Sequence, residues 1–62
     1  KIGNHCHLST NSTINGDVSI DSNSFIGSST TLKQGITIGN HCFINANIYQ
    51  SKNLKNYAKI YE

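Results

Sequence analysis

The feature that most constrains the fold is a six-residue repeat of aliphatic side chains. Isoleucine or leucine occupies every sixth position without a miss from residue 2 to residue 44. The eight positions are Ile2, Leu8, Ile14, Ile20, Ile26, Leu32, Ile38 and Ile44. A period of six matches neither an α-helix nor the alternation of a simple strand. Self-similarity at such a short period is typical of a solenoid.

The other repeat positions fit a narrow interior with tight corners. Four residues after each aliphatic residue the side chain is small or β-branched: Cys6, Ser12, Val18, Ser24, Thr30, Ile36, Cys42 and Ile48. Asn or Gly, which tolerate left-handed backbone angles, occupies a middle position of every repeat but one: Asn4, Asn11, Gly16, Asn23, Gly35, Asn40 and Asn47. We therefore expect one corner in each repeat, always at the same place.

Three repeats then form one triangular coil, and stacked coils pair as parallel strands about 4.8 Å apart. The sequence predicts an all-β fold, a parallel β-helix of about two and two-thirds coils over residues 1–49. After Tyr49 the period breaks. Residues 50–62 are therefore predicted to be an irregular C-terminal extension that leaves the helix.

Composition excludes several classes of function. The 62 residues carry five Lys and three acidic side chains, with only 13% charged residues and a net charge of +2. No cluster of charge is present, which argues against binding to nucleic acid or to a membrane surface. No apolar run approaches the ~18 residues of a transmembrane helix. Because so short a chain builds only a small core, we expect it to be part of a larger protein, an oligomer, or both.

Two pairs of residues recur at the same place two coils apart. Cys6 and Cys42 would lie about 9.6 Å from each other in one interior column, too far for a disulfide, and we expect both to pack inside the helix in a reducing cytosol. His5 and His41, equally far apart, are predicted as corner residues that face water. They cannot share a zinc ion at ~2.0–2.1 Å within one chain. We predict no metal, although a site between subunits stays open.

An outward column carries ring side chains. His7, Phe25 and Phe43 follow one another at intervals of three repeats and fall at equivalent places on successive coils. Exposed, stacked Phe residues usually mark a covered surface. Phe25 and Phe43 are therefore predicted to form a subunit interface, and plain solvent-exposed Phe is the alternative.

The chain also resembles a known family. The stretches Ile2-Gly3-Asn4-His5-Cys6-His7-Leu8-Ser9, Asn15-Gly16-Asp17-Val18-Ser19-Ile20, Phe25-Ile26-Gly27-Ser28 and Gln34-Gly35-Ile36-Thr37-Ile38-Gly39 resemble the hexapeptide-repeat acyltransferases. They are most similar to the C-terminal part of bacterial sialic acid O-acetyltransferases and UDP-4-amino-sugar N-acetyltransferases. The resemblance implies a left-handed β-helix, a cytoplasmic homotrimer, acetyl-CoA as co-substrate, and a nucleotide-sugar or sialic-acid-type acceptor.

The same resemblance implies where acetyl-CoA would bind. The residues at matching positions are His7, Gly16, Gly27, Ser28, Ala46 and Lys52. The family's catalytic His precedes the stretch that matches Ile2-Gly3, so we expect the base upstream of Lys1 and assign no catalytic residue in this sequence. The chain alone is then expected to be inactive. The alternative is a structural or assembly β-helix without activity of its own, and binding of acetyl-CoA separates the two.

Overall fold

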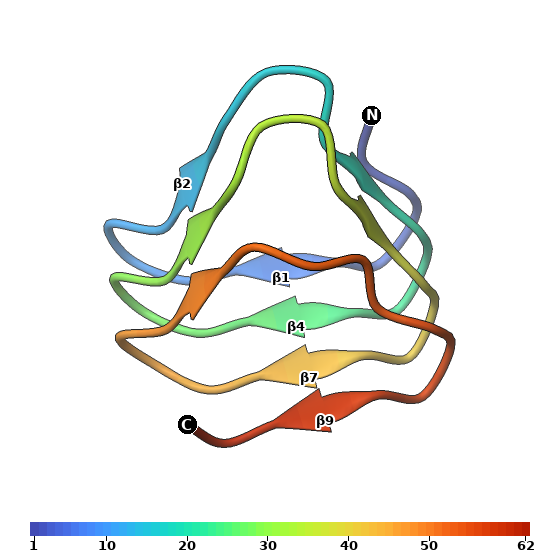
Figure 1. The fold of residues 1–62 in the computed structure, drawn as a ribbon. Helices are drawn as coiled ribbons and strands as arrows, with labels where there is room; N and C mark the ends of the chain where they lie inside the picture. Colours follow the sequence, from blue (N-terminus) through green and yellow to red (C-terminus); the bar gives the residue numbers. More distant parts are fainter.

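The computed structural model describes residues 1–62 as a three-sided coil (Figure 1). Nine two-residue strands make up its sides: β1 (His7–Leu8), β2 (Thr13–Ile14), β3 (Ser19–Ile20), β4 (Phe25–Ile26), β5 (Thr31–Leu32), β6 (Thr37–Ile38), β7 (Phe43–Ile44), β8 (Tyr49–Gln50) and β9 (Lys59–Ile60). They form three parallel sheets, ordered β1-β4-β7-β9, β2-β5-β8 and β3-β6. The chain forms no helix that could span a lipid bilayer.

The register confirms the stacking predicted from the six-residue period. His7 pairs with Phe25 and Phe25 with Phe43, each one coil of three repeats apart. The other two sheets keep the same offset, as in the pairing of Thr13 with Thr31. In Figure 1 the chain runs clockwise and its later coils lie nearer the viewer, so the coil is left-handed. The fold is a parallel β-helix.

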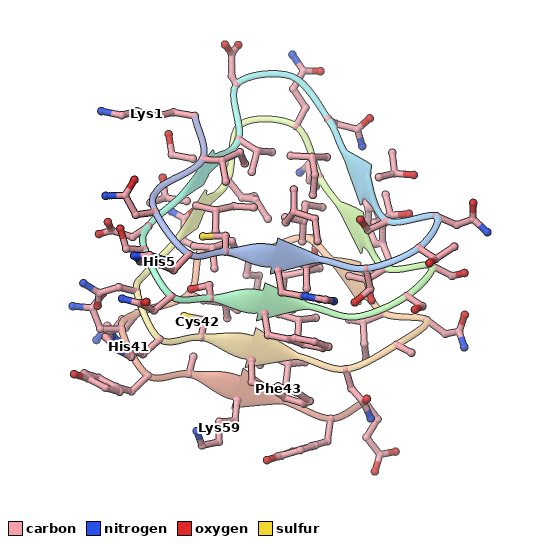
Figure 2. All side chains as sticks on the ribbon, turned by 180° about the vertical axis from the view of Figure 1, so that it is seen from behind. Lys1, His5, His41, Cys42, Phe43 and Lys59 are labelled. Carbon is pink, nitrogen blue, oxygen red and sulfur yellow. The ribbon has the colours of Figure 1, made fainter.

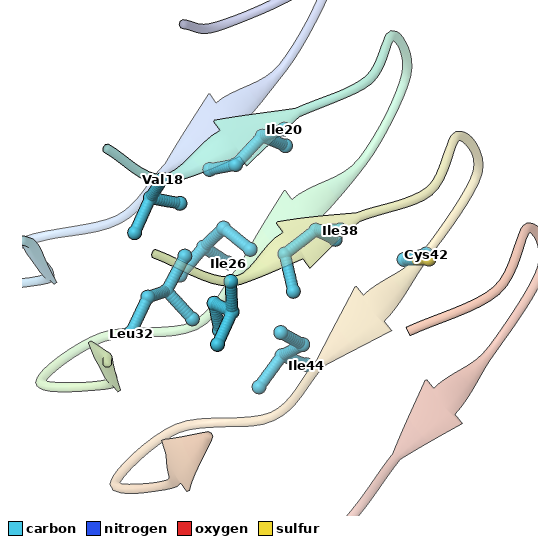
Figure 3. Packing of buried hydrophobic residues seen from close by; sticks show 8 residues of the cluster. Val18, Ile20, Ile26, Leu32, Ile38, Cys42 and Ile44 are labelled. Carbon is cyan, nitrogen blue, oxygen red and sulfur yellow. The ribbon is translucent and has the colours of Figure 1, made fainter. Parts of the chain in front are cut away.

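The repeated aliphatic side chains fill the interior (Figure 3). The core contains Val18, Ile20, Ile26, Leu32, Ile36, Ile38, Cys42 and Ile44, all at most 5% exposed. Burial depends on having a coil on both sides. In the first coil Ile2 and Leu8 are 42% and 40% exposed, whereas Ile20 and Ile26 directly beneath them are 2% and 0% exposed. The first coil is therefore the least protected part of the stack.

Polar side chains inside the helix are paired with backbone groups of the next coil. The Ser24 hydroxyl donates to the Gly39 carbonyl at 2.8 Å and accepts from the Cys42 amide at 3.0 Å. Thr30 makes the equivalent bonds one repeat later, to the carbonyl of Asn45 and from the amide of Ile48. No buried side-chain nitrogen or oxygen lacks a partner. Each hydroxyl therefore occupies the interior without the cost of an unsatisfied polar group.

The corners fall at one fixed position of the repeat, as predicted. The residue three places after each aliphatic residue has a positive φ, between 56° and 84°: His5, Asn11, Asp17, Asn23, Ser29, Gly35, His41 and Asn47. The expectation that Asn or Gly would take this position is only partly correct, because Asn4, Gly16 and Asn40 lie one residue before it. His and Asp also enter the left-handed region more often than most residues. Ser29 has no such preference.

The C-terminal residues correct the sequence prediction. Residues 50–62 were expected to leave the helix, but Leu54 bridges to Ile38 and β9 pairs in parallel with β7. The offset in this last coil is shorter than in the others, since Phe43 pairs with Lys59 and not with Tyr61. The chain therefore continues to coil as far as Ile60, on a path that is two residues shorter.

The shorter path follows from the side chain at position 50. Gln50 takes the interior place of an aliphatic residue and is 8% exposed. Its Nε2 donates to the carbonyl of Lys52 at 2.9 Å, which turns the chain early. The Asn53 side chain then accepts the Thr37 amide at 2.8 Å, and Leu54 restores the aliphatic column.

Candidate functional site

His7 and the two predicted interface residues form one ladder of rings on the outer side of the β1-β4-β7-β9 sheet, which we call the aromatic face. The His7 and Phe25 rings stack with centroids 5.0 Å apart and planes 7° apart. Phe25 stacks on Phe43 at 5.1 Å and 11°, and Phe43 meets Tyr61 at 5.5 Å with the rings tilted by 41°. Figure 2 shows Phe43 on this outer side.

Stacking within the ladder reduces the exposed surface of the two Phe rings. Phe25 and Phe43 are half-buried, because each ring covers its neighbour, while His7 at the end of the ladder is exposed. A stacked pair of rings contributes about 0.5–1.5 kcal/mol beyond its buried area. The ladder therefore stabilises the coil by itself, and the subunit interface stays a prediction.

Three of the predicted acetyl-CoA residues gather at the corner that follows the aromatic face. Ser28 and Ala46 are exposed at equivalent places on successive coils, and the Asn47 amide donates to the Ser28 carbonyl at 2.9 Å. Gly27 beside them is buried. A Cβ added there would lie 2.5 Å from the Ala46 nitrogen. The packing of the next coil is therefore enough to require glycine at position 27.

Gly16 and Lys52 lie at a different corner, the one that follows β2, β5 and β8. Gly16 is exposed, and a Cβ added to it would meet nothing within 4 Å. Its backbone amide donates no hydrogen bond, whereas the His7 amide donates to the Ser24 carbonyl at 3.0 Å. Lys52 is also exposed, two coils further along the same corner. Of the backbone amides at positions 7 and 16, only that of Gly16 is free to bind a ligand.

One chain does not bring the six predicted residues into a single pocket. His7 lies on the aromatic face, Ser28 and Ala46 at one corner, and Gly16 with Lys52 at another. The recess that the structure does contain, about 260 Å³, lies over β3 and β6 and is lined by Ser19, Asp21 and Thr37 among others. It includes none of the six.

The third corner carries the histidines. His5 and His41 are exposed at equivalent places (Figure 2), and the His41 ring stacks on Tyr57 at 5.0 Å. The adjoining thiols point inward, where Cys6 donates to the Asp21 carbonyl and Cys42 to that of Lys55 at 3.1 and 3.2 Å. No group of three or more His, Cys, Asp or Glu side chains gathers around a common point.

Sequence reasoning missed two features near these residues. The second ring stack, His41 on Tyr57, was hidden because the last coil is two residues short and Tyr57 does not fall a full three repeats after His41. The free amide of Gly16 has no signal in the sequence, because it depends on which carbonyl groups of the next coil lie within reach.

Comparison with protein-family models gives a match for residues 1–34, to the family described as bacterial transferase hexapeptide (six repeats). The match covers the first coils, including β1 to β5 and the corners between them. Neither the curated proteins nor the solved structures gave a match.

Proposed function

The chain belongs to the bacterial transferase hexapeptide family, and on that premise we propose that it is the C-terminal β-helix of an acetyl-CoA-dependent bacterial sugar acetyltransferase. The family match over the repeats is the observation that carries the proposal. The transferred group is an acetyl group, and the acceptor is the hydroxyl or amine of a nucleotide sugar or a sialic-acid-type sugar.

The scattered positions of the candidate residues support a site shared between subunits. In a homotrimer packed along the aromatic face, a corner of one chain would lie beside the neighbouring chain. Residues that are far apart in one chain, such as Ser28 and Gly16, would then line one groove from two sides. Stacked Phe25 and Phe43 supply the apolar surface for such packing.

In this proposal the backbone N–H of Gly16 stabilises the negative charge that develops during the reaction. The acceptor oxygen or nitrogen attacks the thioester carbonyl carbon, the carbon–sulfur bond breaks, and the CoA thiol leaves. A preorganised backbone N–H stabilises the oxyanion that forms in between. The exposed amide of Gly16 is free to make that bond, and the missing side chain lets the ligand approach closely. No residue among the 62 is proposed as the general base.

Other candidates contribute to binding. The His7 ring would lie beside the acetyl group at the end of the ladder, and the Lys52 ammonium would meet a CoA phosphate. Gly27, with no room for a side chain, would shape the groove through its backbone. The proposed location is the cytoplasm, because a reducing compartment keeps Cys6 and Cys42 as free thiols.

Titration of acetyl-CoA into the protein, with native mass measured in parallel, tests the proposal. We expect saturable binding by a trimer, and loss of binding in Gly16→Trp, which fills the open space at this corner. Asn4→Trp is the matched control, because it changes the equivalent exposed position at another corner of the first coil. Absence of binding by a folded trimer would refute the proposal and favour the structural β-helix.

A further inference from the structure

The corner between β2 and β3 contains the one Asn-Gly pair of the chain. Nine asparagines are present, and only Asn15 is followed by glycine. Both residues are exposed, at the corner drawn in cyan at the top of Figure 1. An asparagine side chain can be attacked by the backbone nitrogen of the residue that follows it. That reaction needs a nitrogen that is neither hydrogen-bonded nor shielded by a side chain.

Hydrogen bonding excludes most of the other asparagines. In five of the nine cases the amide that follows the asparagine donates a hydrogen bond of 2.9–3.2 Å; these amides belong to Ser12, His41, Ile48, Leu54 and Tyr57. The amides of His5, Gly16, Ser24 and Ala46 donate none. Among these four, only Gly16 has no side chain, and open space surrounds the place where a Cβ would be.

The Asn15 backbone is paired less closely with the next coil than the equivalent residues are. In every other repeat of the first eight, the residue after the aliphatic position donates its amide to the next coil at 2.7–3.0 Å. The Asn15 amide reaches the Leu32 carbonyl only at 3.4 Å. The side-chain Nδ2 of Asn15 donates to the same carbonyl at 3.0 Å, a bond that the reaction breaks because this nitrogen leaves as ammonia.

We infer that the fold selects Asn15–Gly16 as a site of spontaneous succinimide formation and isoaspartate conversion. The Gly16 nitrogen attacks the side-chain carbonyl carbon of Asn15, and a new carbon–nitrogen bond closes a five-membered ring. The proton of that nitrogen passes through water to the side-chain amide, which leaves as ammonia. Water then opens the ring at either carbonyl, giving aspartate or isoaspartate.

Conversion would change the corner in two ways. A new carboxylate appears two residues from Asp17, and in the isoaspartyl form the backbone gains a methylene within one repeat. The Leu32 carbonyl loses the side-chain donor at 3.0 Å. We therefore expect the first coil to loosen with age while the coils beneath it persist.

Incubating the folded protein at mildly alkaline pH tests the inference. Peptide mass mapping reports each amide-to-acid change, and a methyltransferase specific for isoaspartyl groups, supplied with a labelled methyl donor, counts the isoaspartate. We expect loss of one side-chain amide, at Asn15, before any other asparagine reacts. Gly16→Ala should block the reaction, because its methyl group shields the nitrogen and the site has room for it.

A second variant separates the fold from the dipeptide. Ser12→Gly creates another Asn-Gly pair at Asn11, but the amide at position 12 donates to the Ser9 carbonyl at 3.1 Å. We expect Asn15 to react much faster than Asn11 in this variant when folded, and the two rates to converge in urea. Equal rates in the folded protein, or an intact Asn15, would overturn the inference.

Discussion

Replacing Gly27 by alanine is expected to lower the free energy of unfolding by about 3 kcal/mol, the upper part of the range for overpacking. The added Cβ would lie 2.5 Å from both the Ala46 nitrogen and the Asn45 carbonyl carbon, about 1 Å short of ordinary contact at 3.4 Å. Both atoms are backbone and cannot rotate away. The coils would have to part where the Gly27 amide donates to the Ile44 carbonyl at 2.7 Å.

Two other glycines provide matched controls. At Gly16 the Cβ meets nothing and φ is not positive, so alanine should stabilise the protein by about 0.4–1 kcal/mol through the unfolded chain. At Gly35 the space is also open but φ is +84°, so alanine should cost about 1–2 kcal/mol. The three substitutions separate close packing from backbone conformation.

Urea unfolding followed by far-ultraviolet circular dichroism measures all three free energies. A chain of this size is expected to have roughly 3–9 kcal/mol in total, so the loss in Gly27→Ala should shift the midpoint strongly with little change in slope. If Gly27→Ala were as stable as Gly16→Ala, the packing argument would be refuted. Glycine at position 27 would then have to be explained by a ligand.

Three further substitutions test other features. Ser29→Asn should raise the free energy of unfolding by about 0.5–1 kcal/mol, because Asn tolerates the φ of 59° there better than Ser does; an unchanged urea midpoint would contradict this. Thr30→Val should cost about 1–3 kcal/mol in the same assay, because it leaves a part-buried amide and carbonyl of the next coil unpaired, and Thr30→Ser should retain most of the stability. Phe43→Ala removes stacking on two neighbouring rings, about 1–3 kcal/mol, and native mass spectrometry should show loss of trimer; an intact trimer would contradict the proposed interface.

The regular part of the fold could be predicted from the sequence because interior positions tolerate few side chains. An aliphatic residue at every sixth place determined which residues face inward, and the interval of three repeats placed His7, Phe25 and Phe43 in one column. Parallel pairing then leaves little freedom, since a slip in register would move aliphatic side chains to the surface.

The last coil was missed because its interior begins with a polar residue. Gln50 interrupts the aliphatic series, and the next residue of the aliphatic columns, Leu54, comes four places later instead of six. A signal was nevertheless present. Leu54 and Ile60 are six residues apart, and Ala58 follows Leu54 by four, so the repeat resumes in a new phase. The structure adds the bond from Gln50 to the Lys52 carbonyl, which accompanies the shorter turn.

The candidate site was harder to predict because glycine can occupy a position for two separate reasons. At position 27 the next coil occupies the space where a side chain would be, whereas at position 16 the space is empty. Spacing alone cannot distinguish these environments, and a family resemblance treats both as ligand contacts. The distinction needs the backbone of the neighbouring coil.

The repeat itself limits how function can be encoded in such a chain. Most interior places are filled in nearly the same way, as the columns through Ile20 and Ile26 show, so the repeated residues serve the fold whatever the protein does. Specific chemistry is left to outward positions that break the pattern. Here these are the ring ladder from His7, the open corner at Gly16 and the shortened path after Gln50. The ladder and the Gly16 corner lie far apart in one chain, so the proposed groove needs a second copy of the chain. A substitution that breaks the trimer should therefore also abolish binding of acetyl-CoA.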